Sequence, residues 1–573
     1  MRIKSPVLNK LIEKSKDQKI VASLLFFGFI AILYNFVFFI SKNSVDIPFW
    51  DQWNIANIIT SNASLFQILS YQHNEHRIGI GLFIMKVLAK YSDWNQIIEI
   101  QFVSFLVIAS ALLIGVVKYS ISKKIEIFDI LIPLIVLNIF QFENIAWGFQ
   151  IAFTLPLFFL CLWVFSLKIK NPRERYIILT ILSLLSSFSS FHGLILPVFT
   201  IILSFVEYFR YTLISKKLFI LTAITNIFII FLYFFGYTKN FQTAPSLSLS
   251  MPVIKYFSLA VSNGFFFSIN NPPINILIAT IVLSFFAVGI WKLLGSKPRN
   301  DSAFVGCILI FYSITFAVII SSGRSSLGID QALSSRYVTF TMLIPIGLYF
   351  IFSSFKYGKY FKVILLLFII SNSIFLTDKS IKSSNELTEG KRQALACYKA
   401  STISNLDTCF KIFPLFPNKD YLNQRIIKVL QYKKISMFDK VDEIAYIIND
   451  LPNGKPEPID MSRLFTNLQN ISIRNDDFTS LNTDPNMLVT TNKEMRGISW
   501  RSAVTGKVRV YLTFDKKADF SEKYSFTITP LNSIYTINQE KIQEIMGKKI
   551  VKLRVDPTDK AETFKFSDLT IYK

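Results

Sequence analysis

The chain has 573 residues, of which 52% are apolar and only 17% charged, and its mean hydropathy is +0.43. A soluble domain usually carries about a quarter charged residues, so this composition excludes an ordinary cytosolic enzyme. The abundance of apolar residues also excludes a disordered chain, and four Cys are too few for a disulfide scaffold of this length. The formal charge of +23 is typical of nucleic-acid binding, but most of the excess lies among hydrophobic runs.

Eleven mostly apolar runs follow one another along the first two thirds of the chain. A transmembrane helix needs about 20 such residues to cross about 30 Å of hydrocarbon. The first run is too long for a signal peptide and has no small-residue cleavage site nearby. We therefore predict an α-helical polytopic membrane protein whose spans cover residues 20–40, 99–117, 127–141, 151–167, 176–190, 194–209, 218–236, 273–291, 303–321, 338–355 and 361–376.

Lysine and arginine are distributed unevenly between the segments that join these runs. The N-terminus and every second segment after it hold 22 Lys and Arg, whereas the alternate segments up to residue 376 hold eight in a greater length. Because cytoplasmic loops collect positive charge, the N-terminus is predicted inside and residues 377–573 outside. The basic surplus then orients the protein and attracts anionic lipid headgroups, and no nucleic-acid partner is expected.

From residue 377 onward the composition is that of a soluble region. Residues 386–450 contain runs with helical spacing, such as 421–430, so we expect a membrane domain over 1–376 and a helical linker region over 377–455. Beyond residue 456 the apolar period changes to two, which predicts a small antiparallel β-sandwich. Its strands are expected at residues 508–514, 524–528, 551–555 and 564–566.

The four cysteines divide between the two kinds of region. Cys161 and Cys307 lie inside spans and are interpreted as small apolar fillers. Cys397 and Cys409 lie in the outer part, twelve positions apart. In an oxidising compartment they would pair, and the alternative is two unpaired thiols.

Ionisable residues are rare near the centres of the spans and gather on the outer side of the membrane. Ion-coupled transporters usually place their coupling residues near the midplane, so this distribution disfavours that class. It favours an active site at the outer membrane face. All three His of the chain, His73, His76 and His192, lie on that side.

The first outer motif, at residues 46–53, reads Asp-Ile-Pro-Phe-Trp-Asp-Gln-Trp and directly follows the first span. Asp46 or Asp51 could serve as a general base for an acceptor hydroxyl, and Trp50 or Trp53 could stack on the face of a sugar. The alternative is an interfacial aromatic belt with exposed acids.

The second motif is His73-Asn-Glu75-His76-Arg77, which leads into an amphipathic run. Its side chains offer a base, a metal ligand or a phosphate clamp. His73 and His76 are three positions apart and could bind a divalent cation, but the sequence fixes no third ligand, so the metal remains unknown.

The third motif combines Glu143, Trp147 and Gln150 of one outer segment with His192 of a Ser-Phe-His-Gly turn. Each is a polar interruption at the outer end of a span. These side chains are candidates for binding a substrate, and the alternative is that they cap helix ends.

The fourth motif, at residues 323–337, contains Arg324, Asp330, Arg336 and Tyr337 among Ser and Gly. Arginine offers planar, bidentate donors for phosphate oxygens, so the two Arg with neighbouring hydroxyls are a candidate phosphate cradle. The alternative is that the arginines extend to lipid headgroups.

The order of these features resembles the GT-C superfamily of integral membrane glycosyltransferases. Its closest similarity is to bacterial multi-spanning proteins of surface-polysaccharide loci, in which segments such as Phe-Glu-Asn-Ile-Ala-Trp-Gly-Phe-Gln, Phe-His-Gly and Ser-Ser-Arg-Tyr recur. The resemblance covers residues 20–376 well and 377–573 weakly. It implies a protein of the bacterial cytoplasmic membrane, with an outer domain like the jelly-roll carbohydrate-binding modules of some members.

The resemblance further implies a polyprenyl-phosphate sugar donor and a glycan or glycolipid acceptor. The acidic residue of the first outer loop that activates the acceptor corresponds to Asp46 or Asp51. Many members have a paired Asp-Glu there, but Gln52 follows Asp51, which puts a divalent cation at this motif in doubt. Where many have His-Pro-Pro, this chain has Glu75-His76-Arg77.

Direct displacement at the anomeric carbon would then use one Asp as base and Arg324 and Arg336 on the departing phosphate. Three other functions stay open. They are a polysaccharide polymerase or ligase acting on lipid-linked glycans, a lipid-linked oligosaccharide flippase or transporter, and a non-catalytic surface sensor or assembly protein.

Overall fold

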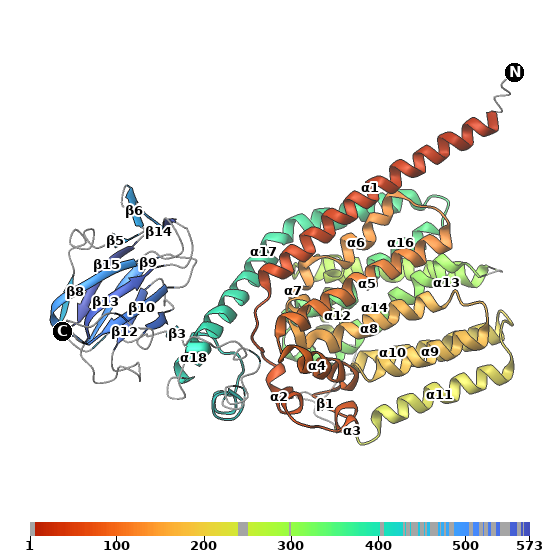
Figure 1. Ribbon diagram of the computed structural model, residues 1–573. Helices are drawn as coiled ribbons and strands as arrows, with labels where there is room; N and C mark the ends of the chain where they lie inside the picture. The colour runs from red at the N-terminus through yellow and green to blue at the C-terminus, as the bar shows by residue number, and fades with distance from the viewer. Residues whose placement is uncertain are drawn as a thin grey trace. The chain divides into compact units, whose positions relative to one another are not determined.

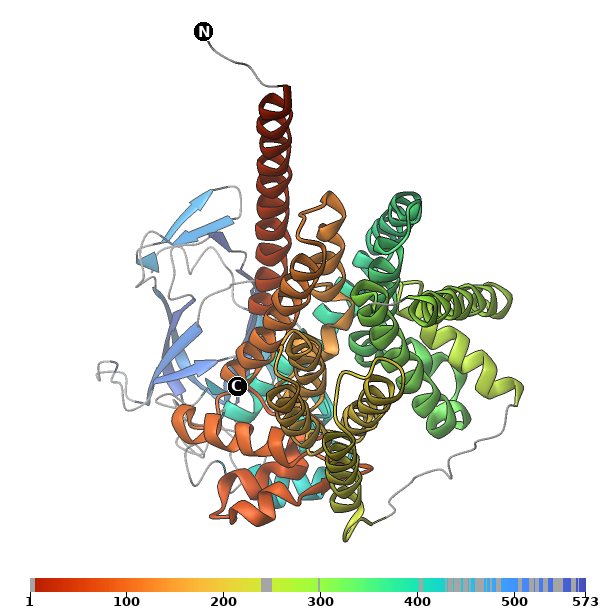
Figure 2. The ribbon, with the colours of Figure 1, turned by 90° about the vertical axis from the view of Figure 1, so that its right-hand side faces the viewer.

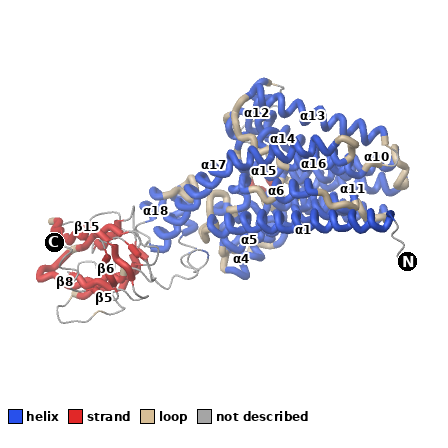
Figure 3. The backbone as a smooth tube through the Cα atoms, turned by 90° about the horizontal axis from the view of Figure 1, so that it is seen from above, coloured by secondary structure: helices blue, strands red, loops and turns tan. Residues whose placement is uncertain are grey.

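The structure is a computed structural model. It describes residues 6–238, 250–296, 299–400, 406–427, 430, 436, 445–446, 452, 455–458, 468–469, 471–474, 477–480, 486–502, 508–514, 520, 525–528, 534–538, 550–557, 563–564 and 566–572. The chain forms two compact units, Met1–Thr388 and Glu389–Lys573. The first is helical and the second carries most of the strands, as the colours of Figure 3 show. The change of composition at residue 377 coincides with no helix end, because α17 continues to Ala400.

The helices of the first unit run mostly side by side (Figure 1). In chain order they are α1 (Pro6–Asn43), α2 (Gln52–Thr60), α3 (Leu65–Leu69), α4 (Gly79–Ser92), α5 (Gln96–Ser122), α6 (Leu131–Val136), α7 (Phe142–Ile145), α8 (Ile151–Ser166), α9 (Pro172–Ser187), α10 (Ile195–Phe209), α11 (Lys216–Phe234), α12 (Met251–Asn263), α13 (Pro272–Gly295), α14 (Asp301–Arg324), α15 (Ser335–Thr341), α16 (Leu343–Ser353) and α17 (Gly358–Ala400).

Ten helical segments in the described part of the chain are long and apolar enough to cross a membrane. They correspond to ten of the eleven runs found in the sequence, which confirms a multi-pass helical membrane protein. The eleventh run, at 176–190, is the 16-residue helix α9. At 1.5 Å per residue α9 is about 24 Å long, so it falls short of the usual length of a span.

The helices differ in how much of their surface the protein itself covers. In the segment Ser335–Ser353, formed by α15 and α16, 94% of the most apolar stretch is buried. In α1 only 6% of that stretch is buried, and apolar side chains such as Phe26 and Phe27 point outward. Such a helix is stable only where lipid replaces water. At the centre, α14 and α16 approach at Gly306 and Gly347, where a Cβ on Gly306 would lie 2.5 Å from the Gly347 carbonyl oxygen.

Residues 44–95 fold into a small layer at the end of α1 that is opposite the N-terminus (Figures 1 and 2). This layer contains α2, α3, the hairpin of β1 (Gln72–His73) with β2 (His76–Arg77), and α4. The predicted amphipathic run is α4: Leu82 and Met85 are buried, and Phe83 and Val87 are exposed. The layer holds the first two outer motifs.

The second unit begins with helical turns and a disulfide. The structure joins Cys397 to Cys409, with Cα atoms 5.4 Å apart, and places α18 at Leu406–Ile412 and a π-helical turn at Tyr421–Ile427. The prediction of helix over residues 386–450 is wrong at β3 (Ala445–Tyr446), which is a strand paired in parallel with β11. Most of residues 428–450 lie outside the described part of the chain.

The remaining strands of this unit form three sheets. They are β4 (Pro456–Pro458), β5 (Leu468–Gln469), β6 (Ile471–Arg474), β7 (Asp477–Ser480), β8 (Asn486–Met495), β9 (Gly497–Ser502), β10 (Val508–Thr513), β11 (Ser525–Ile528), β12 (Ile534–Asn538), β13 (Ile550–Asp556), β14 (Thr563–Phe564) and β15 (Phe566–Tyr572). The sheet orders are β3-β11-β10-β13-β8-β5, β12-β9-β15-β4 and β14-β7-β6.

Along the strands of the two larger sheets, buried apolar side chains alternate with less buried ones, and the buried side chains of both sheets form one core. Val510 and Leu553 from the six-stranded sheet and Trp500 and Ile571 from the four-stranded sheet belong to one buried cluster. Three of the four predicted runs are the neighbouring strands β11, β10 and β13, although Tyr524 lies outside the described residues. The fourth run divides between β14 and β15.

Candidate functional site

The second, third and fourth motifs meet at one end of the helical unit. The first motif lies beside the second in the layer of residues 44–95. The centre is the side chain of Glu75, which follows the tip of the β1–β2 hairpin. Its Oε1 accepts a hydrogen bond of 2.6 Å from Nη2 of Arg324, at the end of α14, and lies 3.5 Å from Nε2 of His76. Residues 249 positions apart thus form one ion pair.

The imidazole of His76 has a defined orientation. Its Nδ1 accepts a hydrogen bond of 3.2 Å from the backbone N–H of Phe191 and lies 3.3 Å from Oγ of Ser190. Since a backbone N–H can only donate, the proton of the neutral ring is on Nε2, toward Glu75. In this state His76 donates to the carboxylate and holds it in place.

The Phe-His-Gly turn can provide this support only because of its glycine. A Cβ on Gly193 would lie 1.9 Å from the carbonyl oxygen of Ser186, at the end of α9. This close approach places Ser190 between the imidazoles of His76 and His192, with its Oγ 2.8 Å from Nδ1 of His192. His192 itself is buried against Phe340 and Phe316, so it supports the site from behind and is not open to a substrate.

The ionisation of Glu75 and His76 follows from these contacts. Burial opposes the charged form of Glu75, but the hydrogen bond from His76 and the charge of Arg324 outweigh it and hold the pKa of Glu75 well below its usual range. Burial is the largest influence on His76 and lowers its pKa, although Glu75 acts in the opposite direction. The site therefore holds a carboxylate and a neutral imidazole at neutral pH.

The two aspartates of the first motif have different surroundings. Oδ1 of Asp46 accepts a hydrogen bond of 2.8 Å from the backbone N–H of Gln96, in the first turn of α5. Asp51 lies 3.5 Å from Nε2 of His73, and its side chain is 27% exposed. Because His73 and His76 are paired across the hairpin, Asp51 is next to the Glu75 cluster. Asp46 supports a helix end, and Asp51 is the accessible acid.

The tryptophans also separate into one exposed ring and two buried ones. Trp53 is fully buried, so it cannot stack on a sugar as the sequence suggested. Trp147 is buried too, and its Nε1 donates to the carbonyl oxygen of Phe49 and to Gln52. Trp50 is 38% exposed and adopts φ 52°, a left-handed conformation that is rare for a residue with a side chain.

Arg77 is not available to a phosphate. Its Nε, Nη1 and Nη2 donate to the carbonyl oxygens of Tyr233, Ser70 and Phe235 at 2.7, 2.8 and 2.6 Å. The side chain is buried. Arg77 therefore fastens the hairpin to the end of α11, and the sequence-based assignment to the donor phosphate is replaced by this role.

Arg336 stands beside the third motif. Its Nε lies 3.9 Å from Oε2 of Glu143, and its side chain is 41% exposed. The hydroxyls of Ser334 and Ser335 donate to the same carboxylate oxygen, which satisfies Glu143 without neutralising Arg336. This guanidinium is therefore the more available of the two predicted phosphate ligands.

Two tyrosines connect the arginines. Tyr256, on α12, is close enough to Tyr337, Arg324 and Arg336 to interact with each electrostatically. Tyr337 is also among the groups that act on Arg324. Burial raises the pKa of Tyr256, so its phenol stays neutral and can donate a hydrogen bond. Tyr256 lies in a segment without a predicted span, and no sequence signal marked it.

Two other predicted substrate-binding residues lie apart from this arrangement. Gln150 is buried at the start of α8, where its carbonyl oxygen accepts from Thr154. Asp330 is exposed and accepts a hydrogen bond of 2.7 Å from Asn270. Neither contacts the Glu75 cluster through a recorded interaction. We therefore leave both out of the candidate site.

Sequence reasoning missed a buried network behind the first motif. Glu99 of α5 accepts from Nε1 of Trp94 at 3.1 Å and from Nε2 of Gln52 at 2.9 Å. Gln52 also accepts from Trp147. Because Gln52 follows Asp51, this network fixes the backbone on which Asp51 stands. The sequence signal that could have revealed this network was Glu99 itself, an acidic residue at the start of the apolar run 99–117.

No group of three His, Cys, Asp or Glu side chains within the described ranges is placed to hold a metal ion. His73 and His76 have Asp51 and Glu75 as their acidic neighbours, in separate pairs. The chain matches no protein-family profile, and no curated protein resembles it closely enough to count as a relative.

Proposed function

We propose that this protein is a membrane glycosyltransferase that moves a sugar from a polyprenyl-phosphate donor to an envelope glycan or lipid-linked acceptor on the extracytoplasmic face. The observation that carries the proposal is the meeting of Glu75 and His76 with Arg324, which places a carboxylate, a neutral imidazole and a guanidinium from distant segments at one end of the helices. Arginines at headgroup depth suit a lipid phosphate, and a neighbouring carboxylate suits an acceptor hydroxyl.

The proposed reaction is a single displacement at the anomeric carbon. Asp51 takes the proton of the acceptor hydroxyl, whose oxygen forms the new bond to the anomeric carbon. The bond from that carbon to the phosphate oxygen breaks, and the lipid phosphate leaves with the electron pair. Arg336 and Arg324 stabilise the charge that develops on the phosphate, so no strong general acid is needed.

Glu75 and His76 are proposed as positioning residues in this reaction. The carboxylate fixes the guanidinium of Arg324 at 2.6 Å, and His76 fixes the carboxylate. Trp50 is the ring left to stack on a sugar, because it is exposed and adjoins Asp51. Asp46 is set aside as the base since it caps α5.

The proposed topology counts α9 as an eleventh crossing, in a locally thinned bilayer, beside the ten longer segments. An odd number of crossings agrees with the distribution of Lys and Arg and brings residues 389–573 outside. The Cys397–Cys409 disulfide supports an oxidising compartment for that unit. Its two larger sheets around one core support a jelly-roll-like β-sandwich that holds glycan.

The test is a transfer assay with protein reconstituted in lipid and radiolabelled polyprenyl-phosphate sugars. Asp51→Asn and Arg336→Gln are each expected to lower the transfer rate by about 100-fold or more, because each removes a group that acts on the transition state. Asp378→Asn and Lys382→Gln, exposed residues on α17, serve as matched controls that keep full activity.

Two outcomes would contradict the proposal. Transfer from a sugar nucleotide, but from no polyprenyl-phosphate sugar, would refute the donor. Full activity of both Asp51→Asn and Arg336→Gln would refute the mechanism. Thermal unfolding of each variant separates a loss of chemistry from a loss of folding.

A further inference from the structure

A cavity of about 320 Å³ opens beside the arginine and serine turn of the candidate site. Its size is at the lower end of the range for small-molecule pockets. The lining mixes aromatic and aliphatic side chains with hydroxyls, an amide, one carboxylate and one ammonium group. The polar lining residues are Glu143, Asn263, Ser268, Ser334, Ser335, Lys379, Ser380 and Ser383.

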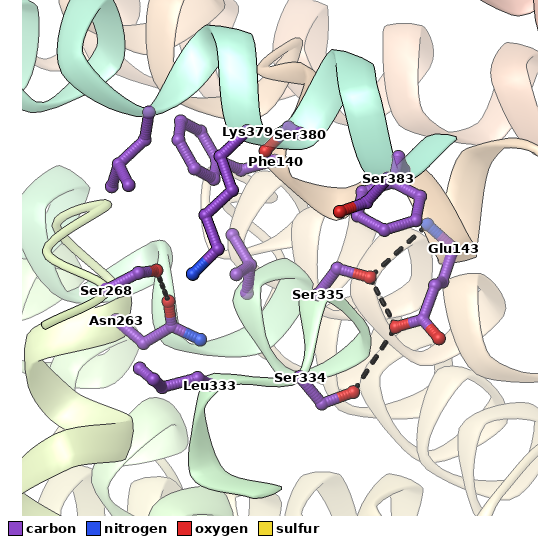
Figure 4. Close-up of a pocket in the computed structure, with 13 residues that line it drawn as sticks. Phe140, Glu143, Asn263, Ser268, Leu333, Ser334, Ser335, Lys379, Ser380 and Ser383 are labelled. Atoms are coloured by element: carbon purple, nitrogen blue, oxygen red, sulfur yellow. Dashed lines mark hydrogen bonds between the residues drawn. The ribbon is translucent and has the colours of Figure 1, made fainter. Parts of the chain in front are cut away.

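The wall formed by α17 carries three polar side chains toward this cavity. Figure 4 shows Lys379 extending from α17 across the pocket toward Asn263 and Ser268, with Ser380 and Ser383 on the same helix. The structure records no hydrogen bond or ion pair for these three α17 side chains within the described part of the chain. Ser380 is 94% buried all the same. Ser383 is half-buried and Lys379 is exposed, so this wall offers a ligand one solvent-accessible ammonium group beside two hydroxyls.

The opposite wall is already satisfied. Glu143, the only carboxylate in the lining, accepts hydrogen bonds from Ser334 and Ser335 and pairs loosely with Arg336 (Figure 4). Ser268 donates to Oδ1 of Asn263. Among the described residues that line the cavity, Glu143 is therefore engaged elsewhere and the ammonium group of Lys379 forms no ion pair. An anion is the ligand that this charge would attract.

The α17 wall is held in position on both sides of the cavity. Asn372 donates to the carbonyl oxygen of Phe265 at 3.0 Å, and Asn138 donates to Ser373 at 3.2 Å. Further along, Thr388 donates to Oδ1 of Asn43 at the end of α1, at 2.9 Å. The site is thus pre-formed, which lowers the entropic cost of binding.

We propose that this cavity binds a substrate sugar that carries a carboxylate, with Lys379 as its counter-charge. Phe140, Phe142 and Leu333 provide the apolar surface for a sugar ring, and the serines provide partners for its hydroxyls. This inference rests on the proposed function because it names the class of that enzyme's substrate. Ser334 and Ser335 precede Arg336, so the bound sugar lies next to the proposed phosphate ligand.

The test is binding without transfer, measured by ligand-observed NMR on full-length protein in lipid nanodiscs. The probes are methyl glucuronide and its neutral counterpart methyl glucoside. Methyl glucuronide is expected to bind about tenfold more tightly, and Lys379→Met to remove that difference. Lys379→Arg should retain part of it, and Lys382→Met on an exposed position of α17 should retain all of it.

Ser383→Leu narrows the same cavity without touching the charge and should weaken both probes. Equal binding of the two probes to the wild type, or unchanged binding to Lys379→Met, would overturn the proposal. Displacement of methyl glucuronide by an equal concentration of inorganic phosphate would overturn it in favour of a phosphate site.

The Asp51→Asn variant distinguishes this proposal from the proposed function. It is expected to bind methyl glucuronide normally while failing to transfer sugar. Normal binding by a wild-type protein that transfers from no lipid donor would leave the pocket standing and refute the glycosyltransferase.

Discussion

The two ends of the helical unit both concentrate charged residues, but they arrange them differently. At the end where α10 finishes, Glu207 is fully buried, is paired with Arg175, lies 2.9 Å from Arg299 and accepts from Tyr176 at 3.0 Å. At the end that holds the Glu75 cluster, Asp51 is partly exposed and lies 3.5 Å from His73, and Arg336 is partly exposed, lies 3.9 Å from Glu143 and donates to Ser334 at 3.5 Å.

This contrast separates two uses of charge. A buried carboxylate with every oxygen satisfied fastens helices together, because breaking such a set leaves uncompensated charge in an apolar interior. An accessible charge with one distant partner keeps bonding capacity for another molecule. Lys118, Asp129 and Tyr349 form a second set in which a carboxylate is fully paired. The residues worth testing for function are therefore those whose bonding is incomplete.

The largest effect is expected at Glu207, in the buried set of charges. Glu207→Gln leaves the buried Arg175 without its carboxylate, and Arg299 with Asp301 alone, and should lower the free energy of unfolding by about 3–5 kcal/mol. Thermal unfolding in detergent measures the loss. Glu174→Gln, an exposed position on α9, is the control and should change little.

Sugar transfer per folded molecule should be the same in Glu207→Gln as in the wild type. If Glu207→Gln unfolds like the wild type but loses sugar transfer, the proposed distinction between structural and functional charges is wrong.

An intermediate effect is expected at Glu75, which has a carboxylate in a partly exposed pair. Glu75→Gln should lower the free energy of unfolding by about 2 kcal/mol at pH 7, because the ion pair with Arg324 is lost. The folded-state pKa of Glu75 is depressed. Its stabilisation is therefore complete above the unfolded value of about 4.5 and disappears as the pH falls through the folded value.

The measurement is thermal unfolding of wild type and Glu75→Gln at a series of pH values. The gap between them should stay constant from about pH 8 to pH 5 and close only in stronger acid. Glu386→Gln, an exposed position on α17, should follow the wild type throughout. A gap that narrows already between about pH 7 and 6 would mean that Glu75 is not held ionised.

The smallest effect is expected at Asp46, five positions before the proposed base. Asp46→Asn keeps an oxygen for the N–H of Gln96 and loses only a charge at the start of α5, so it should cost about 0.5 kcal/mol. Sugar transfer should persist, in contrast to Asp51→Asn. Loss of transfer in Asp46→Asn with normal unfolding would return the role of base to Asp46.

The sequence predicted those parts of the fold that depend on local composition. Hydrophobic runs located ten membrane-crossing helices, and a period of two located β10, β11 and β13. The run at 176–190 was less informative because polar residues at its start shorten the apolar part, and α9 has only 16 residues. Residues 386–450 had helical spacing, but β3 forms through pairing with a strand about 80 positions later.

The candidate site could be predicted only in outline. Glu75, His76, Arg324 and Arg336 were marked by the cost of charge near lipid. The true role of Arg77 depends on carbonyl oxygens at Ser70, Tyr233 and Phe235, and backbone oxygens leave no trace in a sequence.

Two other features of the site were hidden for related reasons. Trp53 is fully buried, although its motif looked the same as an exposed aromatic belt. Lys379 belongs to an unbroken helix that composition alone divides at residue 377. Both depend on which segments come together, and one sequence carries no direct record of that.

The attachment of the β1–β2 hairpin to α11 has a mechanical consequence. Tyr233, near the end of α11, donates from its hydroxyl to the carbonyl oxygen of Glu75, and Arg77 clamps the same helix end. Only 22% of the most apolar stretch of α11 is buried by protein, so most of this helix faces lipid. The tilt of such a helix follows the hydrophobic thickness of the bilayer. The bilayer is thus a structural component of the site, and acyl-chain length becomes a variable that can tune the geometry of Glu75 without any change of sequence.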